Sequence, residues 1–253
     1  MNAVPSPRLA AATAVVVEAA VLARDFFSRR DQLPTETKSG PQDFVTIADR
    51  SVEQLVRERL AASFPGEAVV GEELGGTGGD AYWIVDPIDG TANFLCGSPL
   101  WGVSLGYVVA GQPVLGVVAM PILGEVLAGE GGQLFLDGRP FVRSSASDGI
   151  DVVSLGDSGD DDIADVTRLH QGLREAGWVV ECFHSTSVSM AFAAMGRLAG
   201  HLQKRTTMWD IAGGAALCAA AGLRVEIGHA PPDATLYVKA CSPRLESIVR
   251  GLW

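Results

Sequence analysis

The sequence predicts an α+β fold whose helices and sheets are stacked in layers. From Trp101 to Phe141, apolar runs alternate with turn residues, as in an antiparallel meander of strands. Beyond residue 144, helical and strand-like patterns alternate, which is typical of a mixed α/β arrangement. The chain is 47% apolar and carries 30 glycines in 253 residues, so it can bury a large core and form many tight turns. We therefore expect an antiparallel sheet in an N-terminal unit, 1–143, and a mixed α/β C-terminal unit, 144–253.

The first unit is expected to begin with two helices. An apolar face at helical spacing predicts a core-facing first helix, with Val15, Val16, Ala19, Leu22, Ala23 and Phe26 on that face. The polar stretch 33–43 contains two prolines and a glycine and predicts a loop. A second helix is expected from Thr46, as its cap, to the stop at Pro65-Gly66. Short strands at 68–70 and 82–85 follow, and each delivers acidic residues at its end.

Turn signals and helical periodicity predict the remaining elements. The meander is divided by turns at 111–113, 121–124, 129–132 and 137–138, and the boundary between units is expected at 144–147. In the second unit we expect helices at 162–176, 188–198, 209–221 and from 243, with strands at 178–182 and 223–227.

Composition and charge exclude several classes of protein. A net charge of −11 argues against a general nucleic-acid-binding surface, which needs clustered Lys and Arg. The four cysteines are scattered and form no Cys-x-x-Cys pair, which favours a reducing cytoplasm. Glu18 interrupts the apolar run 9–23, so we predict a core helix there rather than a signal peptide or membrane span. We expect a cytoplasmic protein with neither nucleic acid nor a membrane as partner.

Carboxylates on three separated segments predict a site for hard divalent cations. Asp86 and Asp89 lie three apart in a predicted turn, the doublet Glu72-Glu73 precedes them, and Asp210 follows far downstream. Taken alone, Asp-Pro and Asp-Gly are ordinary turn dipeptides and Glu-Glu is an ordinary exposed pair. Their joint occurrence predicts a Mg²⁺ site, because Mg²⁺ takes oxygen ligands, and Mn²⁺ suits the same donors.

Four motifs, in order, resemble the signatures of the inositol monophosphatase family. Residues 86–91 read Asp-Pro-Ile-Asp-Gly-Thr and resemble its central motif, and 71–73 resemble its Gly-Glu-Glu segment. Residues 44–49 resemble its early Val-Thr-x-x-Asp segment, with Lys38, a predicted substrate contact, upstream. Residues 209–214 resemble its late Trp-Asp-x-Ala-Gly motif. The resemblance spans roughly 9–250, and four ordered motifs are far more specific than one.

The resemblance implies a Mg²⁺-dependent phosphate monoesterase built as a layered αβαβα sandwich. Glu72, Asp86 and the Ile88 carbonyl would hold one ion, whereas Asp86, Asp89 and Asp210 would hold another. A third, weaker ion would share Glu72 through water. Chemistry does not decide between the two glutamates of the doublet. Position in the motif selects the first, and the second is expected behind it or at the surface.

The implied mechanism is attack of a metal-activated water on phosphorus. One ion would lower the pKa of the water and another would stabilise the leaving alkoxide. Thr91 and Asp49 would orient and deprotonate the water, and Glu72 is counted with them as catalytic. Asp89 and the amides of Gly90 and Thr91 would hold the substrate. Asp49 has a second interpretation, because an acid in the first turn of a helix is often only a cap.

The second half departs from the family pattern at two places. Where the family has Gly-Ser or Gly-Thr followed by Ala, this chain reads His-Ser-Thr-Ser (184–187), and Ser187 is predicted to contact substrate. Where inositol phosphatases place a glutamate, this chain has Gln203, followed by Lys204 and Arg205. The added positive charge would favour a substrate with a second phosphate or a carboxylate, unless these two cations are solvated surface residues.

We therefore expect Mg²⁺-dependent hydrolysis of a small phosphorylated metabolite, a polyol or sugar phosphate such as inositol 1-phosphate. Histidinol phosphate, fructose 1,6-bisphosphate and 3′-phosphoadenosine phosphates are alternatives within the family. An alternative of another class is an interaction or regulatory protein with vestigial activity. The resemblance also implies a homodimer, for which the apolar segment 101–120 could supply an interface, although core burial explains its residues equally well.

Overall fold

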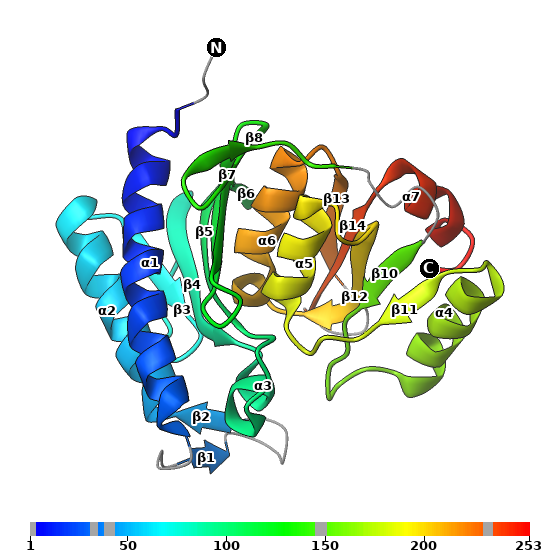
Figure 1. Ribbon diagram of the computed structural model, residues 1–253, viewed down its shortest axis with the longest axis horizontal. Coiled ribbons are helices and arrows are strands. Elements are labelled where there is room, and N and C mark those ends of the chain that lie inside the picture. The colour runs from blue at the N-terminus through cyan, green and yellow to red at the C-terminus, as the bar shows by residue number, and fades with distance from the viewer. Residues whose placement is uncertain (1–3, 31–34, 38–43, 145–150, 230–234) are drawn as a thin grey trace.

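The computed structural model describes residues 4–30, 35–37, 44–144, 151–229 and 235–253, and it stacks them in five layers of helix, sheet, helix, sheet and helix (Figure 1). The predicted α+β sandwich with αβαβα layers is therefore confirmed. Lys38 and residues 145–150 lie outside the described residues, so the lysine contact and the division into two units stay predictions.

The first sheet has seven strands in the order β3-β4-β5-β6-β7-β8-β9. Their bounds are β3 Ala68–Gly71, β4 Ala81–Asp89, β5 Gly102–Val109, β6 Gln112–Met120, β7 Glu125–Glu130, β8 Gln133–Leu136 and β9 Arg139–Phe141. Neighbours are antiparallel except β3 and β4, which run parallel. The antiparallel first half is therefore confirmed. Burial of Trp101, Val103 and Leu105 within this one chain accounts for the apolar character of the meander without an interface between copies.

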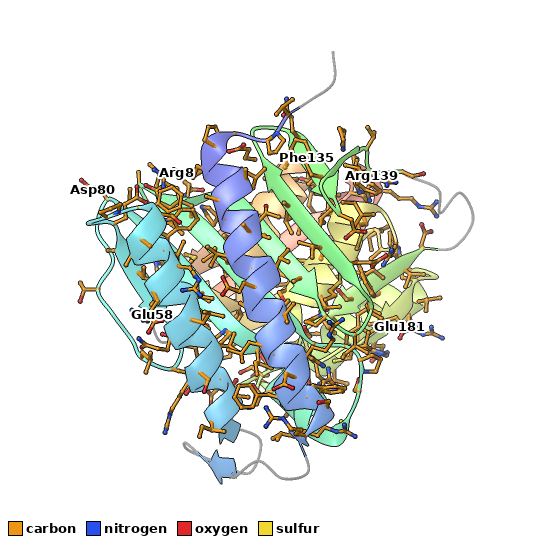
Figure 2. All side chains as sticks on the ribbon, turned by 60° about the vertical axis from the view of Figure 1, so that its left-hand side comes forward. Arg8, Glu58, Asp80, Phe135, Arg139 and Glu181 are labelled. Carbon is orange, nitrogen blue, oxygen red and sulfur yellow. The ribbon has the colours of Figure 1, made fainter. Side chains whose placement is uncertain are left out.

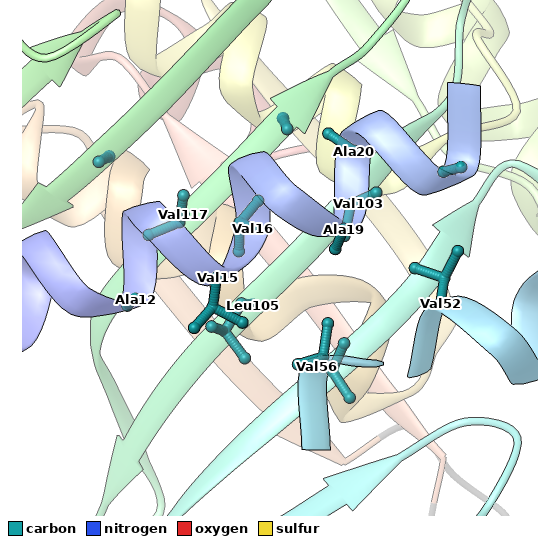
Figure 3. Packing of buried hydrophobic residues seen from close by; sticks show 14 of the residues in the cluster. Ala12, Val15, Val16, Ala19, Ala20, Val52, Val56, Val103, Leu105 and Val117 are labelled. Carbon is teal, nitrogen blue, oxygen red and sulfur yellow. The ribbon is translucent and has the colours of Figure 1, made fainter. Parts of the chain in front are cut away.

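Two helices, α1 (Pro7–Ser28) and α2 (Ile47–Ser63), cover the outer face of this sheet and turn charged side chains such as Glu58 outward (Figure 2). The predicted apolar face of α1 is confirmed, and small residues on it allow close packing. Val15 and Ala19 of α1 share one core cluster with Val56 of α2 and Leu105 of β5 (Figure 3). This cluster supports the sheet from the side opposite the second half.

The second sheet has five strands in the order β11-β10-β12-β14-β13. Their bounds are β10 Val152–Leu155, β11 Val179–Glu181, β12 Gly200–Thr206, β13 Arg224–His229 and β14 Leu236–Cys241. β10 runs parallel to both β11 and β12, whereas β14 is antiparallel to β12 and β13, so this sheet is mixed as predicted. Helices α5 (Thr186–Met195) and α6 (Met208–Ala220) lie between the two sheets, and α4 (Ile163–Glu175) and α7 (Pro243–Val249) cover the outer face (Figure 1).

Close backbone approach brings α6 onto the first sheet. A Cβ atom on Gly116 of β6 would lie 2.1 Å from the carbonyl oxygen of Gly213, and one on Gly106 of β5 would lie 2.7 Å from the Ala212 side chain. Only glycine fits at these positions because any larger side chain would occupy the space of the helix backbone. The contact holds α6, and with it Asp210, against the strands beside β4.

Several local predictions were wrong or incomplete. The expected loop 33–43 contains a strand, β1 (Thr35–Thr37), which pairs with β2 (Phe44–Thr46). The expected turn at 86–89 is part of β4, because Asp86 and Asp89 still pair with β5 across a register shift that lets the ladder skip Pro87. The short helix α3 (Thr91–Cys96) and strands β10, β12 and β14 were not predicted. β12 reads Gly-His-Leu-Gln-Lys-Arg-Thr, which is too polar to indicate a buried strand.

All four cysteines are free, which agrees with the predicted lack of a disulfide framework. None of the helices in the described part of the chain has the length and apolar character needed to cross a membrane.

Candidate active site

Three carboxylates predicted as metal ligands come together between the two halves. One carboxylate oxygen from each of Asp86, Asp89 and Asp210 lies within 4.8 Å of the other two. Asp86 and Asp89 are 2% and 7% exposed in β4, and Asp210 lies in the first turn of α6. The structure thus joins residues more than 120 positions apart, as the motifs predicted.

Repulsion among these groups fits a site that binds cations. Burial raises the pKa of Asp86 well above its usual value, and the charges of Glu72, Asp89, Asp210 and Asp49 raise it further. Burial and the charge of Asp89 raise the pKa of Asp210 to about 6. Buried like charges are unfavourable unless cations neutralise them, and an all-oxygen donor set suits Mg²⁺. The residues present therefore fit the divalent ions that the motifs imply.

Asp89 is held at the start of helix α5. Its Oδ2 accepts hydrogen bonds from the Ser185 hydroxyl (2.6 Å) and from both the amide (2.6 Å) and the hydroxyl (2.5 Å) of Ser187. Its Oδ1 accepts from the amide of Thr186 at 3.2 Å. The helix terminus and its hydroxyl groups therefore stabilise the negative charge of Asp89 and fix its orientation. Ser187 is fully buried with both polar groups on Asp89, and its predicted contact with substrate stays a prediction.

Asp210 is oriented by a capping box at the start of α6. Its Oδ2 accepts from the amide (3.1 Å) and hydroxyl (2.9 Å) of Thr207 and from the hydroxyl of Thr206 (3.1 Å). These three donors oppose the rise in its pKa and leave the carboxylate a single orientation. Trp209 precedes it in the first turn of the same helix.

The segment 86–91 folds back on itself through local hydrogen bonds. The Ile88 amide donates to Asp86 Oδ1 at 3.1 Å, and the Thr91 hydroxyl donates to the Ile88 carbonyl at 3.1 Å. A carbonyl oxygen has a second lone pair, so Ile88 is still able to serve as a metal ligand. Gly90 has a φ of 91° and would place a Cβ atom 3.0 Å from Ser185, which explains the glycine at this position.

The loop that carries Glu72 is held by two residues that the sequence did not reveal. Glu53 of α2 is fully buried and accepts from the amides of Glu73 (2.7 Å) and Leu74 (3.2 Å). Arg57, one turn later, donates to Glu53 (2.8 Å) and to the Val69 carbonyl (3.0 Å). The only signal in the sequence was that Glu53 falls on the buried face of a predicted helix. The amides that it binds are distant in sequence, so its role could not be inferred. Glu53 therefore positions the Glu72-Glu73 turn.

The two glutamates of that turn have different surroundings. Glu72 lines the cavity described below, and its charge acts on Asp86. The Glu73 carboxylate lies 3.9 Å from Arg50 and its side chain is only 2% exposed. Of the two predicted locations, behind Glu72 or at the surface, the surface is therefore contradicted. Asp49, 1% exposed in the first turn of α2, is near enough for its charge to raise the pKa of Asp86.

A cavity of about 700 Å³ opens beside the carboxylates. The first half contributes Glu72, the segment 89–93 and Cys96 to its lining, and the second half contributes residues of β12, α5 and the loop after β10. The cavity therefore has a metal end, lined by Asp89 and Asp210 of the carboxylate group, and an adjoining wall, formed by His201, Gln203 and Arg205, which we call the β12 wall.

Alternation along β12 separates the two predicted cations. Gln203 and Arg205 line the cavity, whereas Lys204 points to the other face, where it pairs with Asp165 of α4 at 3.0 Å and lies over the ring of Trp253. Acidic side chains Asp157 and Asp160 line the same cavity. Of the two cations that were predicted to make the cavity more positive, only Arg205 therefore faces it.

A buried hydrogen-bond network, which the sequence did not reveal, fixes the Gln203 amide. Its Oε1 accepts from the Thr186 hydroxyl at 2.8 Å and lies 3.2 Å from His201 Nε2, while its Nε2 donates to the Arg205 carbonyl at 3.0 Å. Burial lowers the pKa of His201 to about 4, so this imidazole is neutral. Because the Gln203 oxygen can only accept, the proton of the neutral ring is assigned to Nε2, and Nδ1 then accepts from the Ser154 hydroxyl at 2.8 Å. The oxygen of Gln203 is therefore already occupied by donors.

Comparison with known proteins agrees with this geometry. The sequence matches the inositol monophosphatase family over residues 5–236. "Uncharacterized protein y4fL" of Sinorhizobium fredii is 39% identical over 209 residues, which cover 81% of this chain and 74% of that protein. "Fructose-1,6-bisphosphatase/inositol-1-monophosphatase" of Thermotoga maritima is 35% identical over 189 residues, 74% of this chain and 72% of that protein. The extragenic suppressor protein suhB of Bartonella henselae has the same fold, with a TM-score of 0.86 at 24% identity and 98% of both chains covered. The chain belongs to the inositol monophosphatase family.

Proposed function

We propose that this protein hydrolyses a small phosphate monoester, a polyol or sugar phosphate, with Mg²⁺ as cofactor. The observation that carries the proposal is the buried group of Asp86, Asp89 and Asp210 at one end of a cavity of about 700 Å³. Glu72 and the Ile88 carbonyl would complete the ligands of two or three ions. Mn²⁺ would suit the same oxygen donors.

The bound ions would supply an acidified water and would neutralise charge on the phosphate. The chain's own residues do the rest of the chemistry. The Thr91 hydroxyl and the Asp49 carboxylate orient the attacking water and accept its proton. The amides of Gly90 and Thr91 hold the phosphate group, whose oxygens gain negative charge as the bond to the leaving group breaks. Asp89 would act on the substrate as a ligand of an ion beside the phosphate. Asp89, already fixed by α5, needs no rearrangement to take part.

The β12 wall would select the remainder of the substrate. Because the Gln203 oxygen accepts two hydrogen bonds, this side chain offers N–H rather than a carboxylate to a ligand. A glutamate at this position would accept from substrate hydroxyls. We infer that inositol 1-phosphate and related polyol phosphates are accepted, as the name of the Thermotoga maritima relative suggests.

A sugar bisphosphate is a second candidate, which one observation favours. Arg205 lines the cavity on the same wall as Gln203 and would pair with a second phosphate. Fructose 1,6-bisphosphate is the test compound of this class. Asp157 and Asp160, on the same cavity, oppose it.

The test is phosphate release from inositol 1-phosphate, histidinol phosphate, fructose 1,6-bisphosphate, 3′-phosphoadenosine 5′-phosphate and AMP. Each assay runs with Mg²⁺ and with EDTA, on the wild type, on Asp86→Asn and on Asp80→Asn, an exposed aspartate at the start of the β4 hairpin. We expect Mg²⁺-dependent turnover in the wild type and Asp80→Asn only. No turnover of any ester by a folded protein would overturn the proposal and favour an interaction or regulatory role.

A homodimer and a cytoplasmic location are also proposed. Family membership supports the first and four free cysteines support the second. Light scattering on the purified protein would measure the mass of the assembly, and a monomeric mass would contradict the dimer.

A further inference from the structure

A second group of exposed side chains that can ligate a metal borders the same cavity. Asp157 follows β10, and Cys182 and His184 lie between β11 and α5. One ligand atom from each lies within 4.8 Å of the other two, and all three side chains are exposed. Asp157 and His184 also line the cavity.

The three donor atoms form a triangle of suitable size for a tetrahedral ion. His184 Nδ1 lies 3.0 Å from Asp157 Oδ1, Cys182 Sγ lies 3.4 Å from that oxygen, and Sγ and Nδ1 are 3.9 Å apart. Zinc bonds of about 2.3 Å to sulfur and about 2.0–2.1 Å to nitrogen and oxygen place such donors about 3.3–3.6 Å apart at tetrahedral angles. The observed distances span this range, so small side-chain adjustments would suffice.

The kinds of donor select the ion. A thiolate and an imidazole beside one carboxylate favour a thiophilic ion such as Zn²⁺, whereas Mg²⁺ prefers oxygen alone. Asp161 and Asp160 add negative charge nearby and would attract a cation. Burial and Asp157 raise the pKa of the Cys182 thiol to about 12, so an ion must displace the thiol proton, as coordinated zinc does.

A nucleophilic triad is the competing interpretation, and the geometry argues against it. In a triad the imidazole uses one nitrogen for the nucleophile and the other for the acid. Here Nδ1 of His184 faces both Cys182 and Asp157, so no proton can pass between them through the ring.

The segment that carries two of the ligands is fixed by the neighbouring site. Asn93 of α3 donates to the Phe183 carbonyl at 2.6 Å, and Ser185 donates to Asp89 at 2.6 Å. His184 lies between these two anchors. The ligands are therefore held in place before an ion arrives, which lowers the cost of binding.

We propose that Asp157, Cys182 and His184 bind a thiophilic divalent cation, with Zn²⁺ as the ion of choice, at the rim of the cavity. The fourth position is open to water or to a donor atom of a molecule in the cavity. None of its three ligands is proposed to hold Mg²⁺, and its metal binding does not depend on phosphatase activity.

Co²⁺ is the probe, because a thiolate ligand gives it a charge-transfer band in the near ultraviolet that oxygen ligands do not give. Co²⁺ is titrated into the full-length protein in saturating Mg²⁺, which occupies the carboxylate site. We expect one equivalent to give the thiolate band with visible bands of tetrahedral intensity, and one equivalent of Zn²⁺ to remove them.

Variants assign the ligands. Cys182→Ser should abolish the band, and His184→Ala should weaken Co²⁺ binding about tenfold or more. Cys96→Ser is the matched control, since Cys96 is exposed like Cys182 and lines the same cavity as Asp157 and His184. Unchanged melting temperatures would exclude unfolding as the cause. Absence of the band in the wild type, its persistence in Cys182→Ser, or its loss in Cys96→Ser would overturn the proposal.

Discussion

The metal end of the cavity and the β12 wall beside it differ in how far the sequence reveals them. At the metal end, Asp86 and Asp89 sit three residues apart in one motif. Asp86 is bonded within that motif, whereas Asp89 is fixed by helix α5 of the other half of the chain. At the β12 wall, Gln203 is fixed by His201 and Thr186, and strand alternation alone decides that Arg205 faces the cavity while Lys204 does not. The first region shows that motifs can reveal which carboxylates come together, even where a distant helix fixes one of them. The second shows that nearby residues without a motif give no such signal until the fold shows which way each side chain faces.

The largest effect is expected at the metal end. Asp86→Asn removes a ligand proposed to be shared by two ions, so we expect kcat to fall about a thousandfold or more. Mg²⁺ should raise the melting temperature of the wild type but not of the variant, since stabilisation by a ligand requires binding. In EDTA the variant should be at least as stable as the wild type, because one charge of a repelling group is gone. Activity within tenfold of the wild type would contradict this assignment.

The pH dependence of stability separates the metal end from the rest of the molecule. The pKa of Asp210 is raised from 3.8 to about 6, so its contribution to stability is present at low pH and is lost as pH rises from about 4 to above 6. The loss is up to roughly 3 kcal/mol in EDTA. A carboxylate whose pKa is lowered, such as Glu67, has the opposite dependence: its contribution to stability is lost as pH falls.

The free energy of unfolding is measured with denaturant from pH 4 to 8 in EDTA, for the wild type and for Asp210→Asn. The difference between the two plots against pH is the contribution of the Asp210 carboxyl. In Mg²⁺, the unfolding free energies of the wild type and of the variant should change with pH by the same slope near neutral pH. Parallel curves in EDTA would show that the Asp210 carboxyl does not titrate in this range.

Glu53→Gln tests whether Glu53, which is buried in α2, holds the Glu72-Glu73 turn in the position that metal binding needs. The variant keeps an acceptor for the Glu73 amide but loses the charge that pairs with Arg57. We expect the Mg²⁺ concentration for half-maximal activity to rise about tenfold, as for other groups that orient metal ligands, with kcat nearly recovered at saturating Mg²⁺. Glu58→Gln, exposed on the same helix, is the control and should leave both quantities unchanged.

A smaller effect is expected from changing the β12 wall. Gln203→Glu places a carboxylate where the amide now donates to the Arg205 carbonyl. The ratio of kcat/KM for fructose 1,6-bisphosphate to that for inositol 1-phosphate should fall about tenfold, because the new charge repels a second phosphate and accepts from hydroxyls. An unchanged ratio would show that this side chain does not touch the part of the substrate that differs between the two.

The smallest effect is expected at the neighbouring position. Lys204→Gln removes a cation that pairs with Asp165 on the outer face of the sheet, and its cost in unfolding free energy should be about 1 kcal/mol or less. Kinetic constants for both substrates should stay within twofold of the wild type. A change in KM would mean that Lys204 reaches the substrate, against the alternation of β12.

Sequence reasoning located the metal ligands better than the elements around them. The order of motifs predicted that Asp86, Asp89 and Asp210 would meet, and the structure confirms it. The same motif was expected to form a turn, but it continues β4. The prediction failed because a proline between two aspartates is typical of both a turn and an irregular strand. Glu53 and His201 were not predicted as members of the site, since their partners lie in other elements.

The sequence by itself determined the α+β class and the family, and it predicted a site for divalent cations. The layer order followed from the family resemblance. Periodicity, turn residues and carboxylate motifs are local signals, so they can be recognised without the fold. Only the tertiary structure decided which residues share the cavity. It set the glycine contacts that bring α6 to the first sheet. It also set the hydrogen bonds that hold the Gln203 oxygen toward Thr186. It also placed Cys182 and His184 beside Asp157. These relations depend on how sheets and helices pack, and packing brings together side chains that no local pattern connects.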